Sequence, residues 1–141
     1  MIYALDANIV SYFIQNNEHV ITQFRTALTE GAGIVIPPVT YYEIRRGFKH
    51  KSAPKKEKAF SRMCTLYPVG EMSLAAWECA SEIYGSGCRS GKRIPDDDIL
   101  IAAFCRVNDY TLVTSNVRHF EHIDDLRFVN WMIEPPKKVA E

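Results

Sequence analysis

The chain has 141 residues, of which 47% are hydrophobic and 24% charged, and its 17 basic residues balance its 17 acidic ones. This length fits a single domain, and the hydrophobic share excludes a disordered or low-complexity chain. No apolar run reaches the ~18 residues of a membrane span, and the opening MIYALDANIV lacks the basic region of a signal peptide. The four cysteines form no CxxC pair, which excludes a zinc ribbon or thioredoxin-type site. We therefore expect a cytoplasmic protein with no membrane segment.

Short apolar runs bounded by Asp, Gly or Pro predict strands, and apolar residues spaced three or four apart predict helices. The predicted strands cover residues 2–5, 34–36, 111–114 and 126–129, with a candidate edge strand at 67–69. The predicted helices cover about residues 7–14, 18–28, 41–48, 57–66, 74–88 and 98–107, and a Gly- and Ser-rich loop is expected over 86–95. This alternation predicts a three-layer α/β/α sandwich around a mostly parallel, four- to five-stranded sheet. We expect one domain over residues 1–133 and a polar C-terminal tail over 134–141.

Acidic, amide and hydroxyl side chains follow the predicted strands or begin the helices that come next. They are Asp6 and Asn8, Glu43, the run Asp96 to Asp98, and Ser115 and Asn116. In open α/β sheets, ligands bind beyond the carboxyl ends of the strands. Four segments of the chain therefore deliver oxygen-bearing side chains to one rim of the predicted sheet.

Each of these residues also has a purely structural interpretation. Asp6 would cap the first helix, and Thr40-x-x-Glu43 matches a capping box. The aspartates 96–98 would complement a helix dipole, and Asn116 would make a turn. The helix that Asp98 begins is apolar on nearly every side and must be buried, so its first turn can face a cleft. Taken together, the acids favour a functional interpretation.

The three consecutive aspartates cannot all act together inside one helix. Successive helical residues turn by about 100°, so Asp96 joins Asp98 in one site only if it lies in the loop before the helix. Asp97 is then expected to point to solvent.

Several carboxylates in one cleft repel one another and raise one another's pKa unless a cation is present. An all-oxygen set of ligands favours Mg²⁺ or Mn²⁺ over zinc. Such an ion can activate water for attack on a phosphodiester. The HxxH pair His119 and His122 has no Glu after its first His, so we interpret both histidines as surface or packing residues.

A basic stretch suggests what this acidic site would act on. Eight basic residues and one acidic residue lie between Arg45 and Arg62, and Arg89, Lys92 and Arg93 precede the aspartate run. Basic rims around an acidic centre favour a polyanion, although a solvated helix face is the alternative. The residues expected to contact this substrate are Asn8, Arg46, Lys49, Arg93 and Ser115.

Four stretches of the chain resemble the PIN domain, and in particular the VapC-type ribonuclease toxins of bacterial toxin–antitoxin pairs. They are IYALDANIVSYF, VTYYEIRRG, IPDDDILIAAFC and TLVTSNVRHFEHIDDLRFVNW, in that order. Their order and spacing agree with the family from Met1 to about Trp131. The sequence departs from the family at Ala7, where Thr or Ser is common, and this removes a hydroxyl beside the first acid.

The resemblance implies a role for each acid. It places metal ligands at Asp6, Glu43 and Asp98, a fourth position at Asn116, and an additional acid of some members at Asp96. It implies a magnesium-dependent endoribonuclease that cleaves RNA, is usually a homodimer, and is inhibited by a small antitoxin on another chain.

Two other functions remain open from the sequence. A haloacid-dehalogenase-type phosphatase also places Asp after its first strand, but it needs a second Asp where this chain has Asn8. A non-catalytic RNA- or protein-binding module with the same fold would not need Asp6, Glu43 and Asp98.

Overall fold

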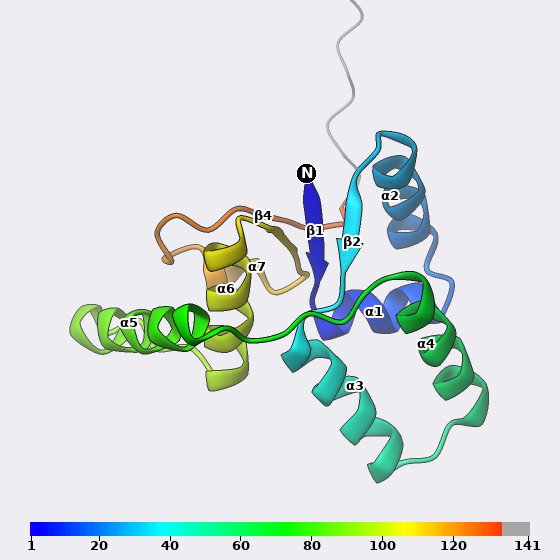
Figure 1. Cartoon of the computed structure of the whole chain (residues 1–141), viewed down its shortest axis with the longest axis horizontal. Helices are drawn as coiled ribbons and strands as arrows, with labels where there is room; N and C mark the ends of the chain where they lie inside the picture. Colours follow the sequence, from blue (N-terminus) through cyan, green and yellow to red (C-terminus); the bar gives the residue numbers. More distant parts are fainter. Residues whose placement is uncertain (134–141) are drawn as a thin grey trace, which may run out of the picture.

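The computed structural model describes residues 1–133, so the predicted tail at 134–141 lies outside the described residues. The strands are β1 (Ile2–Leu5), β2 (Gly33–Val35), β3 (Thr111–Val113) and β4 (Phe128–Val129). The helices are α1 (Ala7–Ile14), α2 (Glu18–Thr29), α3 (Pro38–His50), α4 (Pro54–Leu66), α5 (Leu74–Ser90), α6 (Asp96–Asn108) and α7 (Val117–Phe120). Figure 1 shows the sheet between the long α5 and α6 on one side and α1 to α4 on the other.

The four strands form one parallel sheet in the order β2-β1-β3-β4. Each parallel connection needs a crossover, and helices supply most of them. The predicted edge strand is reduced to one parallel bridge between Ile36 and Val69. The predicted α/β class and parallel sheet are therefore confirmed, with four strands and this single bridge beside them.

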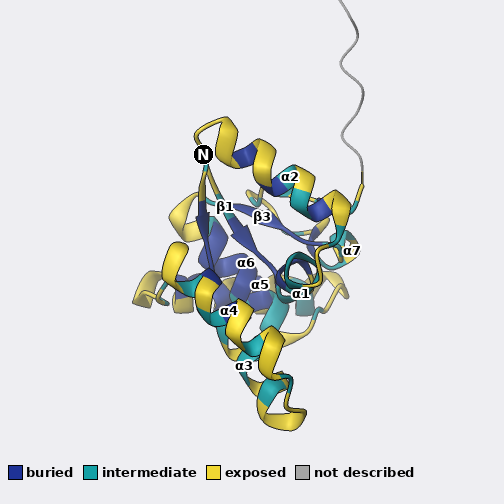
Figure 2. Ribbon diagram, turned by 90° about the vertical axis from the view of Figure 1, so that its right-hand side faces the viewer, coloured by how far each residue is buried: buried dark blue, intermediate teal, exposed yellow. Residues whose placement is uncertain are grey.

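Alternation along the strands divides the core between the two faces of the sheet, because successive strand residues point to opposite sides. One face packs against α5 and α6 through Ala4, Val35 and Leu112. The other packs against α1, α2 and α4 through Leu5, Ile34 and Val113. Figure 2 shows the buried residues concentrated on the strands and on the inward sides of these helices. This core on both faces of the sheet confirms the predicted three-layer α/β/α sandwich.

Several element boundaries differ from the prediction. Helix α3 begins at Pro38 rather than near Tyr41, since proline is well suited to the first position of a helix. The predicted capping box is therefore wrong, because Thr40 already lies inside the helix and is fully buried. Helix α5 continues through the Gly- and Ser-rich segment to Ser90, where Gly91 ends it in the left-handed conformation at φ 72°. Among the helices of residues 1–133, none is long and apolar enough to cross a membrane.

Candidate functional site

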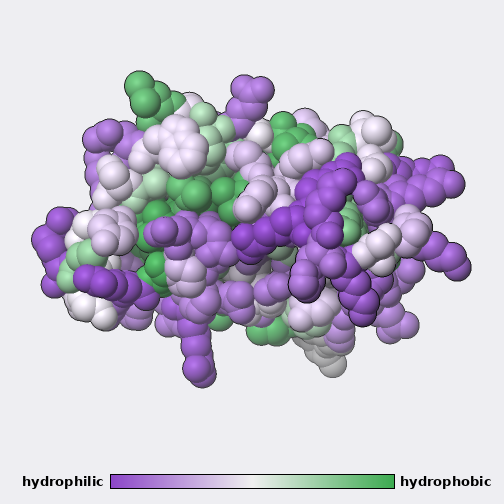
Figure 3. Space-filling view, turned by 90° about the horizontal axis from the view of Figure 1, so that it is seen from below, coloured by the Kyte–Doolittle hydropathy of each residue, from purple (hydrophilic) through white to green (hydrophobic). Residues whose placement is uncertain are grey.

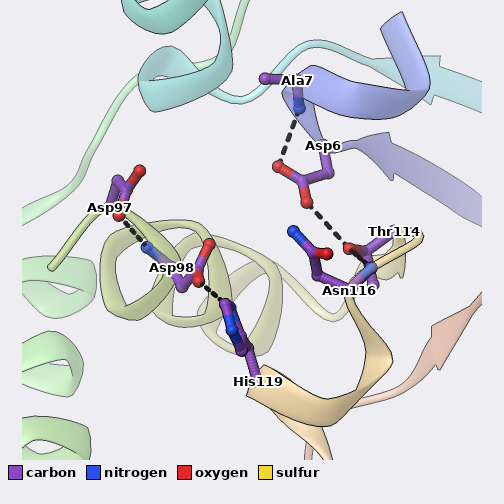
Figure 4. A network of polar contacts seen from close by, with 7 residues as sticks. All are labelled: Asp6, Ala7, Asp97, Asp98, Thr114, Asn116 and His119. Atoms are coloured by element: carbon purple, nitrogen blue, oxygen red, sulfur yellow. Dashed lines mark hydrogen bonds and ion pairs between the residues drawn. The ribbon is translucent and has the colours of Figure 1, made fainter. Parts of the chain in front are cut away.

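Asp6 lies at the carboxyl end of β1, and two neighbouring groups hold its carboxylate. The backbone N–H of Asp6 donates to the Val113 carbonyl at 2.9 Å, which places the residue between β1 and β3. Its Oδ1 accepts from the Ala7 N–H at 2.8 Å, and its Oδ2 accepts from the Thr114 hydroxyl at 2.8 Å (Figure 4). The side chain thus caps α1 with one oxygen, as the structural interpretation expected, and is fixed at the sheet edge by the other. Burial raises the pKa of Asp6 despite these two hydrogen bonds.

Glu43 is brought to the same edge by a buried threonine. The Thr40 hydroxyl donates to the Leu5 carbonyl at 2.8 Å, which pins the first turn of α3 beside the end of β1. Residues three apart on a helix lie on the same face, so Glu43 faces the Asp6 side. Its pKa is raised to about 7, first by burial, then by the charges of Asp97 and Asp6, while Arg46 opposes the shift.

Asp98 lies in the first turn of α6 and contacts a histidine from α7. Its Oδ2 is 2.5 Å from Nδ1 of His119, and its side chain is only 13% exposed (Figure 4). Burial raises the pKa of Asp98, the hydrogen bond from His119 lowers it, and the charges of Asp6 and Asp97 raise it. The charge of Asp6 raises the pKa of both Glu43 and Asp98, and the charge of Asp98 raises that of Glu43, so the three carboxylates belong to one region of negative charge.

Asp97 contributes to this region, contrary to the expectation that it points to solvent. Its charge raises the pKa of Asp6, Glu43 and Asp98. Asp96 is exposed and is the first residue of α6, rather than part of the preceding loop. Asp96 is expected to join Asp98 only if it lies in the loop before the helix. This condition is not met, because α6 begins at Asp96, two residues before the predicted start.

Asn116 and Ser115 follow β3, where the predicted rim continues. The Asn116 N–H donates to the Thr114 hydroxyl at 3.0 Å, and this hydroxyl donates in turn to Asp6. Figure 4 shows the exposed Asn116 side chain at the same end of the sheet as Asp6. Ser115 is half-buried beside it.

These carboxylates suit a hard divalent cation by their chemistry. The group nearest the strand ends consists of oxygen donors whose pKa values are raised first by burial and then by the charges of neighbouring carboxylates, and a cation would favour their charged forms. Within residues 1–133, no three Asp, Glu, His or Cys side chains lie close enough to ligate one ion together as they stand. Mg²⁺ is commonly held by one or two carboxylates, with waters and substrate phosphates completing its shell. The residues therefore fit Mg²⁺ or Mn²⁺ without forming a closed cage.

A basic groove borders the acids on the α3 side. It has a volume of about 390 Å³ and is lined by Ala7, Ser11, Glu43, Arg46, Lys51 and Lys56, among others. Of the residues predicted to contact substrate, Arg46 lines this groove, whereas the exposed Lys49 and Asn8 do not. Figure 3, which views the molecule from below, shows hydrophilic side chains gathered on the right, where α3 and α4 lie.

Sequence reasoning missed three residues of this site: Thr114, Asp97 and His119. Thr114 directly follows β3, so the search for polar groups after strands should have included it. His119 lies in α7, three residues after Asn116, and its backbone N–H donates to the Asn116 carbonyl at 3.1 Å. The HxxH pattern of His119 and His122 suggests zinc ligands, and it gives no sign of the hydrogen bond between His119 and the Asp98 carboxylate.

Comparison with known proteins gives one consistent family. The PIN domain profile matches residues 3–126. The ribonuclease VapC1 of Haemophilus influenzae (strain R2866) is 28% identical over 136 residues, which cover 93% of this chain and 98% of that protein. The tRNA(fMet)-specific endonuclease VapC of Shigella flexneri is 27% identical over 130 residues, covering 92% of this chain and 97% of that protein.

A solved structure shares the fold. The crystal structure of VapBC2 from Rickettsia felis, bound to a DNA fragment from its promoter, superposes with a TM-score of 0.85 at 23% identity. The match covers 93% of this chain and 99% of that one. The profile match, the parallel sheet and the acids at its carboxyl edge agree, and the chain belongs to the PIN domain family.

Proposed function

We propose that this protein is a divalent-metal-dependent endoribonuclease and the toxin of a toxin–antitoxin pair, acting on RNA in the cytoplasm. The observation that carries the proposal is the convergence of Asp6, Glu43 and Asp98 at the carboxyl edge of the sheet, where each has a raised pKa. Full-length similarity to proteins named ribonuclease VapC supports the reaction class.

Asp6 and Asp98 are the direct ligands of Mg²⁺ or Mn²⁺ in this proposal, and Glu43 either joins them or orients the attacking water. When bound, the ion supplies charge stabilisation at a phosphodiester and lowers the pKa of water. Thr114 keeps the Asp6 carboxylate in one orientation, and His119 does the same for Asp98. Asn116, with Asp97 in place of the predicted Asp96, completes the polar lining around the reacting phosphate.

RNA is the proposed substrate because basic side chains flank the acidic residues. Arg46 is close enough to Glu43 to lower the pKa of that residue, so it can also reach a phosphate held there. The basic groove on the α3 side extends this positive surface away from the acids through Lys51 and Lys56. Contacts of this kind position a nucleic acid backbone without reading its sequence.

The proposed partners are a small antitoxin on another chain and a second copy of this one. The VapBC2 structure from Rickettsia felis supports the antitoxin, since its chain shares this fold over nearly its whole length. Helix α5 supports the second copy, because Leu74 and Trp77 are 83% and 51% exposed on it. Apolar side chains this exposed are typical of a surface that another chain covers.

Cleavage of labelled RNA by the purified chain, with Mg²⁺, Mn²⁺ or EDTA, tests the proposal. Asp6→Asn and Asp98→Asn should each abolish cleavage in either metal, while thermal melting shows that both variants fold. Glu78→Gln is the matched control, because it removes an exposed carboxylate from α5, away from the site.

Two results would contradict the proposal. Full activity in both aspartate variants would remove the site. RNA binding without cleavage in any metal, together with no heat of Mg²⁺ binding in calorimetry, would favour a non-catalytic binding module instead.

A further inference from the structure

A second groove lies beside α5 and contains His119, the hydrogen-bond partner of Asp98. It has a volume of about 610 Å³ and is lined by the C-terminal half of α5 and the loop after it, by α6 at Ile99 and Arg106, and by α7 with the loop that follows. This volume lies within the ~300–1,000 Å³ range of pockets that bury small ligands. His119 lines the groove and also contacts Asp98 at 2.5 Å, so the groove opens directly beside a proposed metal ligand.

The groove carries more positive than negative charge. Its lining includes five basic residues, Arg89, Lys92, Arg93, Arg106 and Arg118. It also includes three acids, Glu82, Asp124 and Asp125, which leaves an excess of two positive charges. None of these five basic side chains forms an ion pair within 4.0 Å with an acidic residue in residues 1–133. If they only kept this face of the protein solvated, they would not need to line one cavity together.

The Gly- and Ser-rich segment brings Lys92 and Arg93 to the groove. Gly91, at φ 72°, turns the chain back along the last turn of α5, and the Lys92 N–H donates to the Gly87 carbonyl at 2.9 Å. A Cβ at Gly87 would lie 3.0 Å from the Lys92 carbonyl oxygen and 3.7 Å from Cα of Arg93. The close return of the loop therefore favours glycine at this position. The Lys92 ammonium is then 3.3 Å from Nδ1 of His122 across the groove.

We infer that the groove on the α5 side binds the one or two nucleotides that flank the scissile phosphate on one side, with Lys92 and Arg118 facing their phosphates. This inference rests on the proposed function. A strand that crosses a cleavage site must leave it in two directions, and each of the two grooves contains either a site acid or the direct partner of one. The α3 groove contains Glu43, and the α5 groove contains His119, the partner of Asp98. The backbone phosphates of single-stranded RNA match its charge.

The test measures how cleavage depends on RNA length. A substrate with one defined cleavage site is shortened separately from its 5′ and its 3′ side, and KM and kcat are measured for each RNA. With the wild-type chain, shortening on one side should raise KM about 10-fold, equivalent to about 1.4 kcal/mol. In Lys92→Glu and Arg118→Glu, KM for the full-length RNA should already be raised, and shortening on that side should have no further effect.

Three further variants separate charge from shape and from folding. Ser86→Trp fills the groove from an exposed position without changing charge and should abolish the same length dependence. Arg25→Glu reverses an equally exposed base on α2 and should retain the wild-type dependence. Lys92→Arg should retain it as well, and the slope of log KM against log salt should fall by about 1 only in the charge-reversed groove variants.

The outcomes distinguish this inference from the proposed function. If the wild type cleaves RNA and the groove variants keep its length dependence, the inference is wrong and the nuclease assignment stands. If the wild type cleaves nothing, binding of an unreactive DNA oligonucleotide in EDTA decides the matter. Equal binding by wild type and Lys92→Glu, or loss of binding only to an acidic peptide, would overturn the inference.

Discussion

Asp6 and Asp98 are equivalent in charge and proposed role, but the fold holds them by different means. Asp6 is 6% exposed, and its carboxylate accepts one backbone N–H and one hydroxyl from the adjacent strand end. Asp98 has one side-chain partner, His119, whose own side chain is 43% exposed. The Asp6 arrangement comes with the pairing of β1 and β3, whereas that of Asp98 depends on one short helix.

This difference indicates where the site is rigid and where it can adjust. The Asp6 carboxylate is fixed once β1 and β3 pair, because one of its partners is the next residue of the chain and the other, Thr114, directly follows β3. A carboxylate held by a partly exposed histidine can exchange that partner for a cation or a substrate group. We therefore expect substitutions around Asp6 to affect stability and activity together, and those around Asp98 to affect mainly activity.

Among the residues that hold these two carboxylates, the largest expected effect is that of Thr114→Val, which removes the hydroxyl that fixes Asp6. The substitution leaves a buried carboxylate oxygen and the Asn116 N–H without their partner, so it should cost about 1–3 kcal/mol in the free energy of unfolding. Activity should fall about 10–100-fold, as for other residues that orient metal ligands. Denaturant unfolding and RNA cleavage rates measure the two effects.

A neighbouring threonine provides the control for this variant. Thr111 lies on the same strand, and its buried hydroxyl has no hydrogen-bond partner among residues 1–133. Thr111→Val should therefore be neutral or stabilising and leave activity intact. Equal losses in both variants would mean that Thr114 acts through packing alone.

His119→Ala is expected to have the next largest effect, and it addresses the Asp98 side. Removing the imidazole should lower kcat about 10-fold and change the melting temperature little, since the ring is partly exposed. His119→Asn, which keeps a donor near Asp98, should recover part of the activity. His19→Ala is the control, because His19 is an exposed histidine on α2 that lines neither groove. Unchanged activity in His119→Ala would leave Asp98 with no need for a positioning partner.

Glu43 is affected by the charges of both Asp6 and Asp98, and this should appear in the pH dependence of stability. Its pKa in the folded chain is about 7 against 4.5 for an unperturbed glutamate, so the folded state binds this proton more tightly than the unfolded state. The resulting stabilisation is complete below about pH 4.5 and is lost as the pH rises through 7. Without metal, the melting temperature of the wild type should therefore fall more between pH 5 and 8 than that of Glu43→Gln.

Metal should reverse this trend. Mg²⁺ should raise the melting temperature more at pH 8 than at pH 5, because its carboxylate ligands must be deprotonated. Glu78→Gln should retain the wild-type profile. Parallel pH profiles in wild type and Glu43→Gln would show that Glu43 does not share the charge of Asp6 and Asp98.

The smallest expected effect distinguishes two neighbouring aspartates. Asp97→Asn removes a charge that acts on Asp6, Glu43 and Asp98, so it should weaken Mg²⁺ binding in calorimetry. Asp96→Asn should change that affinity less, since Asp96 is exposed at the start of α6. The reverse order would restore Asp96 to the site.

Much of the architecture could be read from local pattern. The apolar runs that end at Asp6 and Thr114 identify two central strands, and the rule that ligands bind at the carboxyl ends of parallel strands directs attention to Asp6, Glu43 and Asp98. These inferences succeed because side-chain periodicity and breakers such as Gly and Pro act within a few residues.

Only the tertiary structure decided which side chains meet. The Thr40 hydroxyl bonds to Leu5, 35 residues away, and His119 contacts Asp98 from another helix. The choice between Asp96 and Asp97 depended on where α6 begins, since each residue turns a helix by about 100° and local sequence pattern does not fix helix ends to the single residue. Strand and helix types are properties of short segments, whereas the orientation of a polar side chain depends on partners that folding brings from elsewhere in the chain.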